Sequence, residues 1–360
     1  MLQERNRRHY FLDNIKWFIA ITVIFHHSFN HFQNVFPSYR QAFNLILGIN
    51  QSYFMDLFFF ISACFIIPSY VKKGKNSFNK DKLIRLGGAV VITLLLIDPI
   101  NDVVKFLGEK TILQSYTGYL ISSDRWNTII DLQWGNLNLM GVTWFCWTLL
   151  IFTLIWSRFS QKDNLQGVQN KPFPSLSKIT LFCLVMVPIN SIAVMLNQHL
   201  GDGFLGFHLL KYFPTYIAAF YFGLQAHKYQ WIEQINFKHG IYGLIISFLV
   251  WCLIIFGHLK IDYTYSIFRT FMAVGMIMFL LYIFKLLFNR SNRFTKELSR
   301  ASFPAYVVQF IFLNYLFNWV APKLTWNPWM ITIVIGATAT LCSFILGMIL
   351  VRLPYFNKVF

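Results

Sequence analysis

The run Lys16-Trp-Phe-Ile-Ala-Ile-Thr-Val-Ile-Phe-His26-His27 places a cation and two imidazoles in an otherwise apolar stretch. The stretch predicts a helix, in which eleven steps of about 100° bring Lys16 and His27 to one face, about 16 Å apart along the axis. Its length and hydrophobicity are typical of a membrane span. Ionisable groups inside a span are costly, and by default they mark a functional site.

The composition of the whole chain supports the membrane assignment. Its 360 residues are 56% hydrophobic and 19% aromatic, and only 12% are charged, compared with about 25% charged residues in soluble domains. The net charge of +17 is spread over the ends of apolar segments rather than along one continuous basic face. This distribution excludes a nucleic-acid partner and leaves the lipid bilayer as the expected environment.

Ten apolar windows are long enough to cross about 30 Å of hydrocarbon. The expected fold is therefore an all-α integral membrane protein with about ten transmembrane helices in one bundle, and residues 1–360 form a single domain. The expected spans are 15–32, 51–70, 86–101, 138–156, 178–198, 209–226, 240–258, 266–288, 303–320 and 329–351.

Basic residues alternate between the two sides of this arrangement. One side collects most of the Lys and Arg residues, from the N-terminus, from 72–85, from 158–178, from 228–238, from 285–300 and from the C-terminus. Because cytoplasmic segments are enriched in Lys and Arg, both termini are expected to be cytoplasmic. The opposite side keeps only Arg40, Lys105, Lys110, Arg125, Lys260 and Lys323.

The first span carries a polar stripe at helical spacing, formed by Asp13, Lys16, Ala20, His27 and His31. This stripe must face protein or water. It can serve as a seam that joins helices by hydrogen bonds, or it can carry chemistry. The pair His27 and His31 has the spacing of metal ligands, but no third ligand is evident, and no metal site is expected.

A histidine at this depth is suited to acyl transfer, because a neutral imidazole can act as a general base towards a hydroxyl or can itself accept an acyl group. Asp56 on the second span is predicted to orient His27, since it lies about four turns above the cytoplasmic end of its helix, level with residues 27–31. The alternative for Asp56 is a structural ion pair with Arg269 or Lys211.

A basic cluster follows the second span, from Lys72 to Arg85. Such a cluster commonly sets topology and contacts anionic lipid. Lys82 and Arg85, three residues apart at a helix entrance, can instead hold the phosphates of a nucleotide-like donor that arrives from the cytoplasm.

Several segments together resemble the acyltransferase 3 family of integral membrane acyltransferases, and in particular its glucan-modifying, succinyl- and acetyl-transferase-like branch. Their order along the chain agrees with the family pattern, and they cover nearly its whole length. They are Tyr10-Phe-Leu-Asp13-Asn-Ile-Lys16 with His27, Met55-Asp56-Leu-Phe-Phe-Phe-Ile-Ser62-Ala63, Lys82-Leu-Ile-Arg85, Thr143-Trp144-Phe145 and Ser302-Phe-Pro-Ala-Tyr306-Val-Val-Gln309.

The chain departs from the family pattern at four of these positions. Lysine stands at 16 where arginine is more usual, and Ala63 stands where glycine is expected. Thr143 and Gln309 each replace a histidine. Of the family's histidines, His27 is therefore left as the main catalytic residue.

The resemblance implies transfer of an acetyl or succinyl group from cytoplasmic acyl-coenzyme A to a hydroxyl of an extracytoplasmic glycan or related acceptor, at a bacterial inner membrane. Acyl-coenzyme A is then a substrate, and no permanently bound cofactor is expected. The extracytoplasmic esterase-like domain of some relatives is not expected. In this scheme Lys16, Lys82 and Arg85 hold the donor, and His27 with Asp56 carries the reaction. The substrate path would be lined by Asp13, Ser62, Trp144, Tyr306 and Gln309.

Two other classes of protein fit a bundle with a buried polar seam. A transporter or flippase for a glycan or lipid-linked precursor also needs such a seam, although no inverted repeat and no pair of spans broken by Gly or Pro is evident in the sequence. A membrane scaffold without chemistry is the third alternative, and it predicts that His27 is dispensable.

Overall fold

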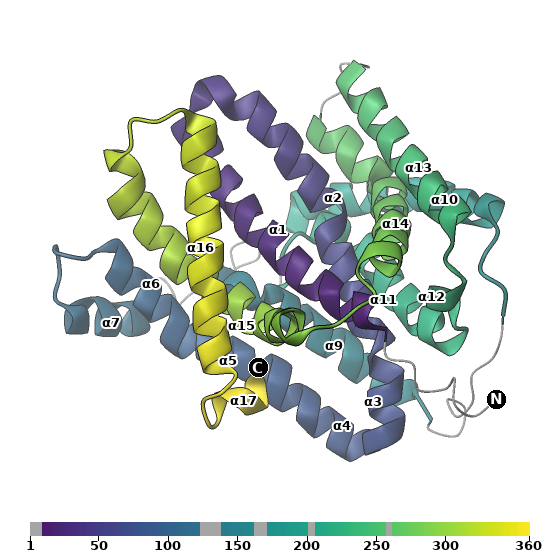
Figure 1. Ribbon diagram of the computed structural model, residues 1–360, viewed down its shortest axis with the longest axis horizontal. Helices are drawn as coiled ribbons and strands as arrows, with labels where there is room; N and C mark the ends of the chain where they lie inside the picture. Colours follow the sequence, from purple (N-terminus) through teal and green to yellow (C-terminus); the bar gives the residue numbers. More distant parts are fainter. Residues whose placement is uncertain (1–8, 123–137, 162–170, 201–205, 257–260) are drawn as a thin grey trace.

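A computed structural model describes residues 9–122, 138–161, 171–200, 206–256 and 261–360. Within these ranges the chain is helical and forms no β-strand (Figure 1). The all-α class predicted from the sequence is thus confirmed. Of the basic residues used to argue topology, Arg5, Arg7, Arg8, Arg125, Lys162 and Lys260 lie outside the described residues.

The helices follow the order of the apolar windows. The first half contains α1 (Tyr10–Val35), η2 (Pro37–Tyr39), α2 (Arg40–Cys64), α3 (Ile66–Lys73), α4 (Lys75–Lys82), η3 (Leu83–Gly87), α5 (Gly88–Ile92), η4 (Thr93–Ile97), α6 (Asp98–Lys105), α7 (Ile112–Ile121), η5 (Asn138–Thr143) and α9 (Trp144–Phe159). The second half contains α10 (Leu176–Leu200), η8 (Leu210–Tyr212), α11 (Phe213–Lys228), α12 (Trp231–Gln234), α13 (Phe237–Phe256), α14 (Ile261–Leu287), α15 (Arg293–Tyr315), η9 (Leu316–Val320), η10 (Ala321–Lys323), α16 (Pro328–Leu350) and α17 (Phe356–Val359).

Eight helical segments of the described chain are long and apolar enough to cross a membrane, and they correspond to eight of the ten predicted spans. The other two predicted spans form α1 and α11. Helix α11 directly continues the 3₁₀ helix η8, so that residues 210–228 form one helical segment. Helix α1 packs against four other helices, and α11 packs mainly against α2, while Ile217 and Tyr221 of α11 remain exposed.

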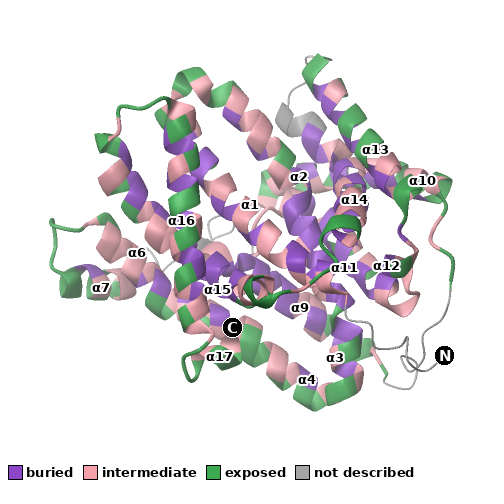
Figure 2. Cartoon of the chain, in the orientation of Figure 1, coloured by how far each residue is buried: buried purple, intermediate pink, exposed green. Residues whose placement is uncertain are grey.

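Helix α1 lies at the centre of the molecule and packs against α2, α14, α15 and α16. Figure 2 shows buried residues gathered in this central group, whereas α10, α13 and α16 expose much of their outer surface. In the segment that contains α2, 67% of the most apolar window is buried, compared with 28% for α10. The polar stripe of α1 therefore faces protein rather than lipid.

Small residues allow two of the helix pairs to approach closely. A Cβ atom on Gly223 of α11 would overlap the Phe60 carbonyl oxygen and the Ala63 side chain of α2. On α13 and α14, Gly243 and Gly275 face each other, and a Cβ on either would overlap the backbone oxygen of the other. Close backbone approach at small residues is a common mode of helix association in membranes.

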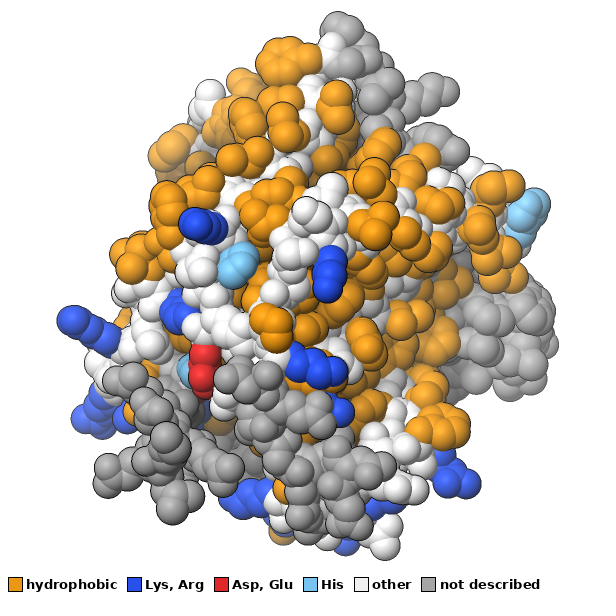
Figure 3. Space-filling view, turned by 90° about the vertical axis from the view of Figure 1, so that its right-hand side faces the viewer, with side chains coloured by type: hydrophobic (Ala, Val, Ile, Leu, Met, Phe, Trp, Pro, Cys, Tyr) orange, Lys and Arg blue, Asp and Glu red, His pale blue; other side chains and the backbone are white. Residues whose placement is uncertain are grey.

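The face formed by α10 and α13 is apolar over a broad area. Figure 3 shows hydrophobic side chains spread across this side of the molecule. The exposed apolar residues of α10 and α13 include Leu181, Leu184, Val185, Leu244, Phe248 and Leu249, each of which exposes more than a third of its surface. An exposed apolar surface of this kind belongs against lipid tails, as expected for a membrane protein.

Candidate functional site

A cavity of about 490 Å³ surrounds His27, and it is called the histidine cavity below. Helices α1, α2, α6 and α15, the turn before α9 and residues 208–209 supply its wall. Its polar side chains are two further imidazoles, one carboxylate and several carboxamides: His26, His208, Asp98, Asn30, Gln51, Asn101 and Asn314.

The ring of His27 is fixed by aromatic neighbours on two helices. Its centroid lies 4.7 Å from that of Phe310 on α15 and 5.7 Å from that of His26. His26 in turn meets Phe54 of α2, with the ring centroids 5.1 Å apart. His31 stacks on Phe317 at 3.9 Å and does not line the cavity. The half-buried His27 therefore presents an oriented imidazole to a partly polar space.

A second, larger cavity of about 750 Å³ carries most of the predicted donor-binding residues, and we call it the basic cavity. Lys16, Lys82 and Arg85 line it, together with Asp13 and Ser62. Additional charged side chains reach it from distant parts of the sequence: Lys73, Asp81, Glu297, Arg300 and Arg352. Cations thus surround one space although they come from four parts of the chain: α1, the segment after α2, α15 and the residues after α16.

Lys16 is held in place by two contacts. Its Nζ lies 2.9 Å from the Asp13 carboxylate, one helical turn away, and 4.2 Å from the centre of the Phe65 ring. Because Asp13 and Lys16 are both partly exposed to the basic cavity, the ion pair orients the ammonium group without removing it from the space where a ligand would bind.

Arg85 lies in a π-helical turn, η3, between α4 and α5. Its Nη2 donates a hydrogen bond to the main-chain oxygen of Phe360, 3.0 Å away. Lys82, one turn earlier, is half-buried with its Nζ 5.4 Å from the centre of the Phe78 ring. A single π-helical turn inside an α-helix is frequent at functional sites, and here it contains one of the three predicted donor-binding residues.

Tyr306 is common to the two cavities. Its hydroxyl donates a hydrogen bond to the main-chain oxygen of Val142, next to Gly141, whose φ of 45° is in the region that favours glycine. Gln309 donates from Nε2 to the Tyr306 carbonyl oxygen at 2.8 Å and is fully buried. Tyr306 is thus the boundary between the basic cavity and the histidine cavity.

The remaining predicted path residues divide between these spaces. Trp144 lines the histidine cavity, where its ring lies 5.7 Å from that of His208. Asp13 and Ser62 line the basic cavity. Gln309 lines neither, because it is packed behind Tyr306. Thr143, where the family pattern has histidine, is buried and also lies outside both walls.

Asp56 is placed differently from the sequence prediction. Its Oδ2 lies 2.5 Å from Nη2 of Arg269, and both side chains are fully buried. Arg269 also donates to the Gln51 carbonyl oxygen at 2.6 Å and to the Thr215 hydroxyl at 3.2 Å. Asp56 does not line the histidine cavity. The described contacts therefore place Asp56 in an ion pair with Arg269, which was the structural alternative. They do not include a contact between Asp56 and His27.

Several residues of the histidine cavity were not predicted from the sequence. Asp98 and Asn101 lie in the first turn of α6, directly after an apolar run. The carboxylate of Asp98 at the end of a predicted span was the signal that could have indicated a site. A Cβ on Gly141 would lie 3.5 Å from Asp98 Oδ1, which shows how closely the backbone approaches this carboxylate. His208 gave no signal, because it lies outside any periodic segment.

The fold and these cavities define a polytopic membrane protein with two polar cavities that meet at one tyrosine. The sequence model of the acyltransferase 3 family, described as an acyltransferase domain, matches residues 9–348. The chain therefore belongs to this family and is a membrane acyltransferase. No curated protein and no solved structure matches it.

Proposed function

We propose that this protein transfers an acetyl or succinyl group from acyl-coenzyme A, bound in the basic cavity, to a hydroxyl group of a glycan or related acceptor in the histidine cavity. The observation that carries the proposal is the shared wall at Tyr306. It brings a space rich in cations next to a space that contains a half-buried imidazole.

The basic cavity fits the donor chemically. Coenzyme A carries phosphate groups, and cations that converge from several helices bind such groups through charge-assisted hydrogen bonds. Lys16, Lys82 and Arg85 are the proposed phosphate ligands, and Asp13 positions Lys16. With this cavity on the cytoplasmic side, both termini face the cytoplasm, in agreement with the distribution of basic residues.

His27 is the proposed general base. Its imidazole takes the proton from the acceptor hydroxyl, the hydroxyl oxygen attacks the thioester carbonyl carbon, and the carbon–sulfur bond breaks. The proton then passes from the imidazolium to the departing thiolate, so that an ester and free coenzyme A are formed. In the two-step form of the same reaction, the imidazole carries the acyl group before the acceptor receives it.

The histidine cavity has the chemistry that a hydroxyl-rich acceptor requires. Asn30, Gln51, Asn101 and Asn314 offer donors and acceptors of hydrogen bonds around His27. Phe54, Trp144 and Phe310 supply apolar surface to the same space. This combination supports a sugar hydroxyl as the acceptor, and thus the modification of a cell-envelope glycan at a bacterial inner membrane.

The test uses the purified full-length protein with radiolabelled acetyl- and succinyl-coenzyme A and a panel of oligosaccharides. We expect release of coenzyme A and stable label on one class of acceptor, and we expect His27→Ala to abolish both. Equal turnover by wild type and His27→Ala would refute the role of His27. A transporter would move the glycan across vesicles without releasing coenzyme A, and that result would refute the enzyme proposal as a whole.

A further inference from the structure

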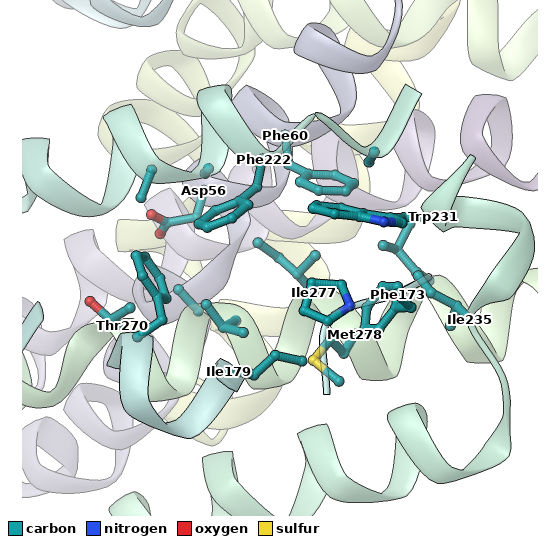
Figure 4. A pocket seen from close by; sticks show the side chains of 18 of the residues that line it. Asp56, Phe60, Phe173, Ile179, Phe222, Trp231, Ile235, Thr270, Ile277 and Met278 are labelled. Atoms are coloured by element: carbon teal, nitrogen blue, oxygen red, sulfur yellow. The ribbon is translucent and has the colours of Figure 1, made fainter. Parts of the chain in front are cut away.

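A third cavity, of about 280 Å³, has Asp56 and Phe60 of α2 in its wall (Figure 4). Helices α2, α10, α11, α12 and α14 form its wall, and it shares no lining residue with the two cavities described above. On α2, Phe60 faces this space, whereas the following residues Ile61 and Ser62 face the basic cavity. The third cavity therefore does not belong to the proposed path between donor and acceptor.

The shape of this cavity is set by one face of α14. Thr270, Val274, Ile277 and Leu281 line it at helical spacing, and the eleven steps between the first and the last correspond to about 16 Å. Small residues on α11, such as Ala218, leave the space open along this length. The result is a narrow, elongated volume with almost entirely apolar walls.

The two ends of the cavity differ. Figure 4 shows Asp56 and Thr270 at one end and Trp231 with Ile235 at the other. The Trp231 indole donates to the Pro172 carbonyl oxygen at 3.1 Å, which ties this end to the segment that leads into α10. Lys178, in the first turn of α10, is exposed and also lines the cavity. Lys178 follows Pro172 by six residues and so belongs to the segment that is tied to Trp231, and tryptophan and lysine are typical residues of the membrane–water interface.

We propose that this cavity binds one acyl chain of an anionic phospholipid, with the lipid phosphate at Lys178. Apolar walls do not retain water, and an empty space would forfeit the dispersion contacts of the atoms that line it. Helix α10, which forms part of the wall, exposes Leu181, Leu184 and Val185, so the cavity lies beside a helix that faces the acyl chains of the bilayer. Phe182 and Phe222, 4.9 Å apart, join α10 and α11 beside the chain.

An ion pair links one end of this cavity to the histidine cavity. Asp56 at the deep end holds Arg269, which donates to the Gln51 carbonyl oxygen, and the same Gln51 lines the histidine cavity. Occupancy of the lipid site is therefore expected to stabilise the part of α2 that faces His27.

The experiment measures lipid labelling rather than catalysis. Full-length protein is reconstituted in phosphatidylcholine vesicles that contain a small fraction of phosphatidylglycerol with a diazirine in one acyl chain, and the adducts are mapped by mass spectrometry. We expect adducts on Phe182, Ile277 and Met278. The filling variant Ala218→Trp should lower their yield severalfold, whereas Ile217→Trp should not, because Ile217 is 52% exposed on the outer side of α11.

The head-group assignment is tested with Lys178→Met, which keeps the apolar stem of the side chain but removes its charge. Since a lysine near a membrane surface favours an anionic lipid by about fivefold, the yield from phosphatidylglycerol should fall by about that factor. The exposed Lys238→Met is the control.

The proposal is overturned if labelling is spread evenly over the lipid-facing helices, if phosphatidylcholine carrying the same diazirine labels the cavity equally, or if free fatty acid alone displaces the probe. If Ala218→Trp does not fold, Ala273→Leu fills the same space from α14 and is judged by the same criteria.

Discussion

His27 and Asp56 are both ionisable residues on central apolar helices, yet the structure gives them opposite surroundings. His27 is half-buried and lines a polar cavity. Asp56 is fully buried and holds Arg269 at 2.5 Å. The buried charge of Asp56 is compensated by the charge of Arg269 on another helix. The imidazole of His27, in contrast, is available to a ligand in the cavity.

Depth in the membrane therefore does not by itself identify a catalytic residue. A buried carboxylate needs a partner, and a well-placed guanidinium supplies both the charge and several hydrogen bonds. An imidazole can stay neutral and therefore tolerates a site without a charged partner. Access to a cavity, more than depth, separates the two roles.

The largest expected effect is at His27. Because general acid–base catalysis contributes roughly 10²- to 10⁴-fold, His27→Asn should lower kcat by a factor in this range while the protein still folds. His31→Asn is the matched control, since His31 stacks on Phe317 outside both cavities. Release of coenzyme A by the purified variants provides the measurement, and similar losses in both variants would contradict the distinction.

The second effect concerns the stability of the ion pair. Arg269→Met leaves the Asp56 carboxylate buried without its partner, and the free energy of unfolding should fall by about 3–5 kcal/mol. The double variant Asp56→Leu with Arg269→Met should recover most of this loss. Unfolding in mixed micelles measures both.

The same double variant also tests whether Asp56 has a catalytic role, because its activity can be measured on a protein that is folded. If the pair is structural, the double variant retains turnover close to that of wild type. A stable but inactive double variant would indicate that Asp56 takes part in catalysis.

A smaller effect is expected from the basic cavity. Lys82→Ala with Arg85→Ala removes two charge-assisted hydrogen bonds to the donor, but both side chains are partly exposed and screened. The KM for acyl-coenzyme A should therefore rise about tenfold with little change in kcat. The control, Lys72→Ala with Lys80→Ala, removes exposed charges outside the cavity. An equal rise in KM in this control would indicate that the basic cluster sets membrane topology and does not bind the donor.

The smallest effect is expected at the boundary between the cavities. Tyr306→Phe removes the hydrogen bond to the Val142 oxygen, so the free energy of unfolding should fall by about 1 kcal/mol, and kcat/KM should fall by about fivefold at most. Tyr315→Phe on the same helix is the control, because Tyr315 is 46% exposed. A loss as large as that of His27→Asn would show that the phenol takes part in the reaction itself.

Much of the fold was accessible from the sequence, since each predicted span coincides with a helix of the described chain. Two of these helices, α1 and α11, are not among those whose length and hydropathy meet the criteria of a membrane span. Hydropathy reports how apolar a segment is, whereas the surroundings of a central helix depend on the helices packed around it.

Local sequence determined the membrane class, the helices and the shared face of Lys16 and His27, because helical periodicity depends only on neighbouring residues. The basic residues that line one cavity were also visible as clusters. Tertiary structure alone decided that Asp56 meets Arg269, 213 residues away, that Tyr306 joins two cavities, and that Asp98 and His208 line the same cavity as His27. Such contacts depend on the rotation and depth of the packed helices. These are set by close approaches between residues far apart in the sequence, such as that of Gly223 to Phe60.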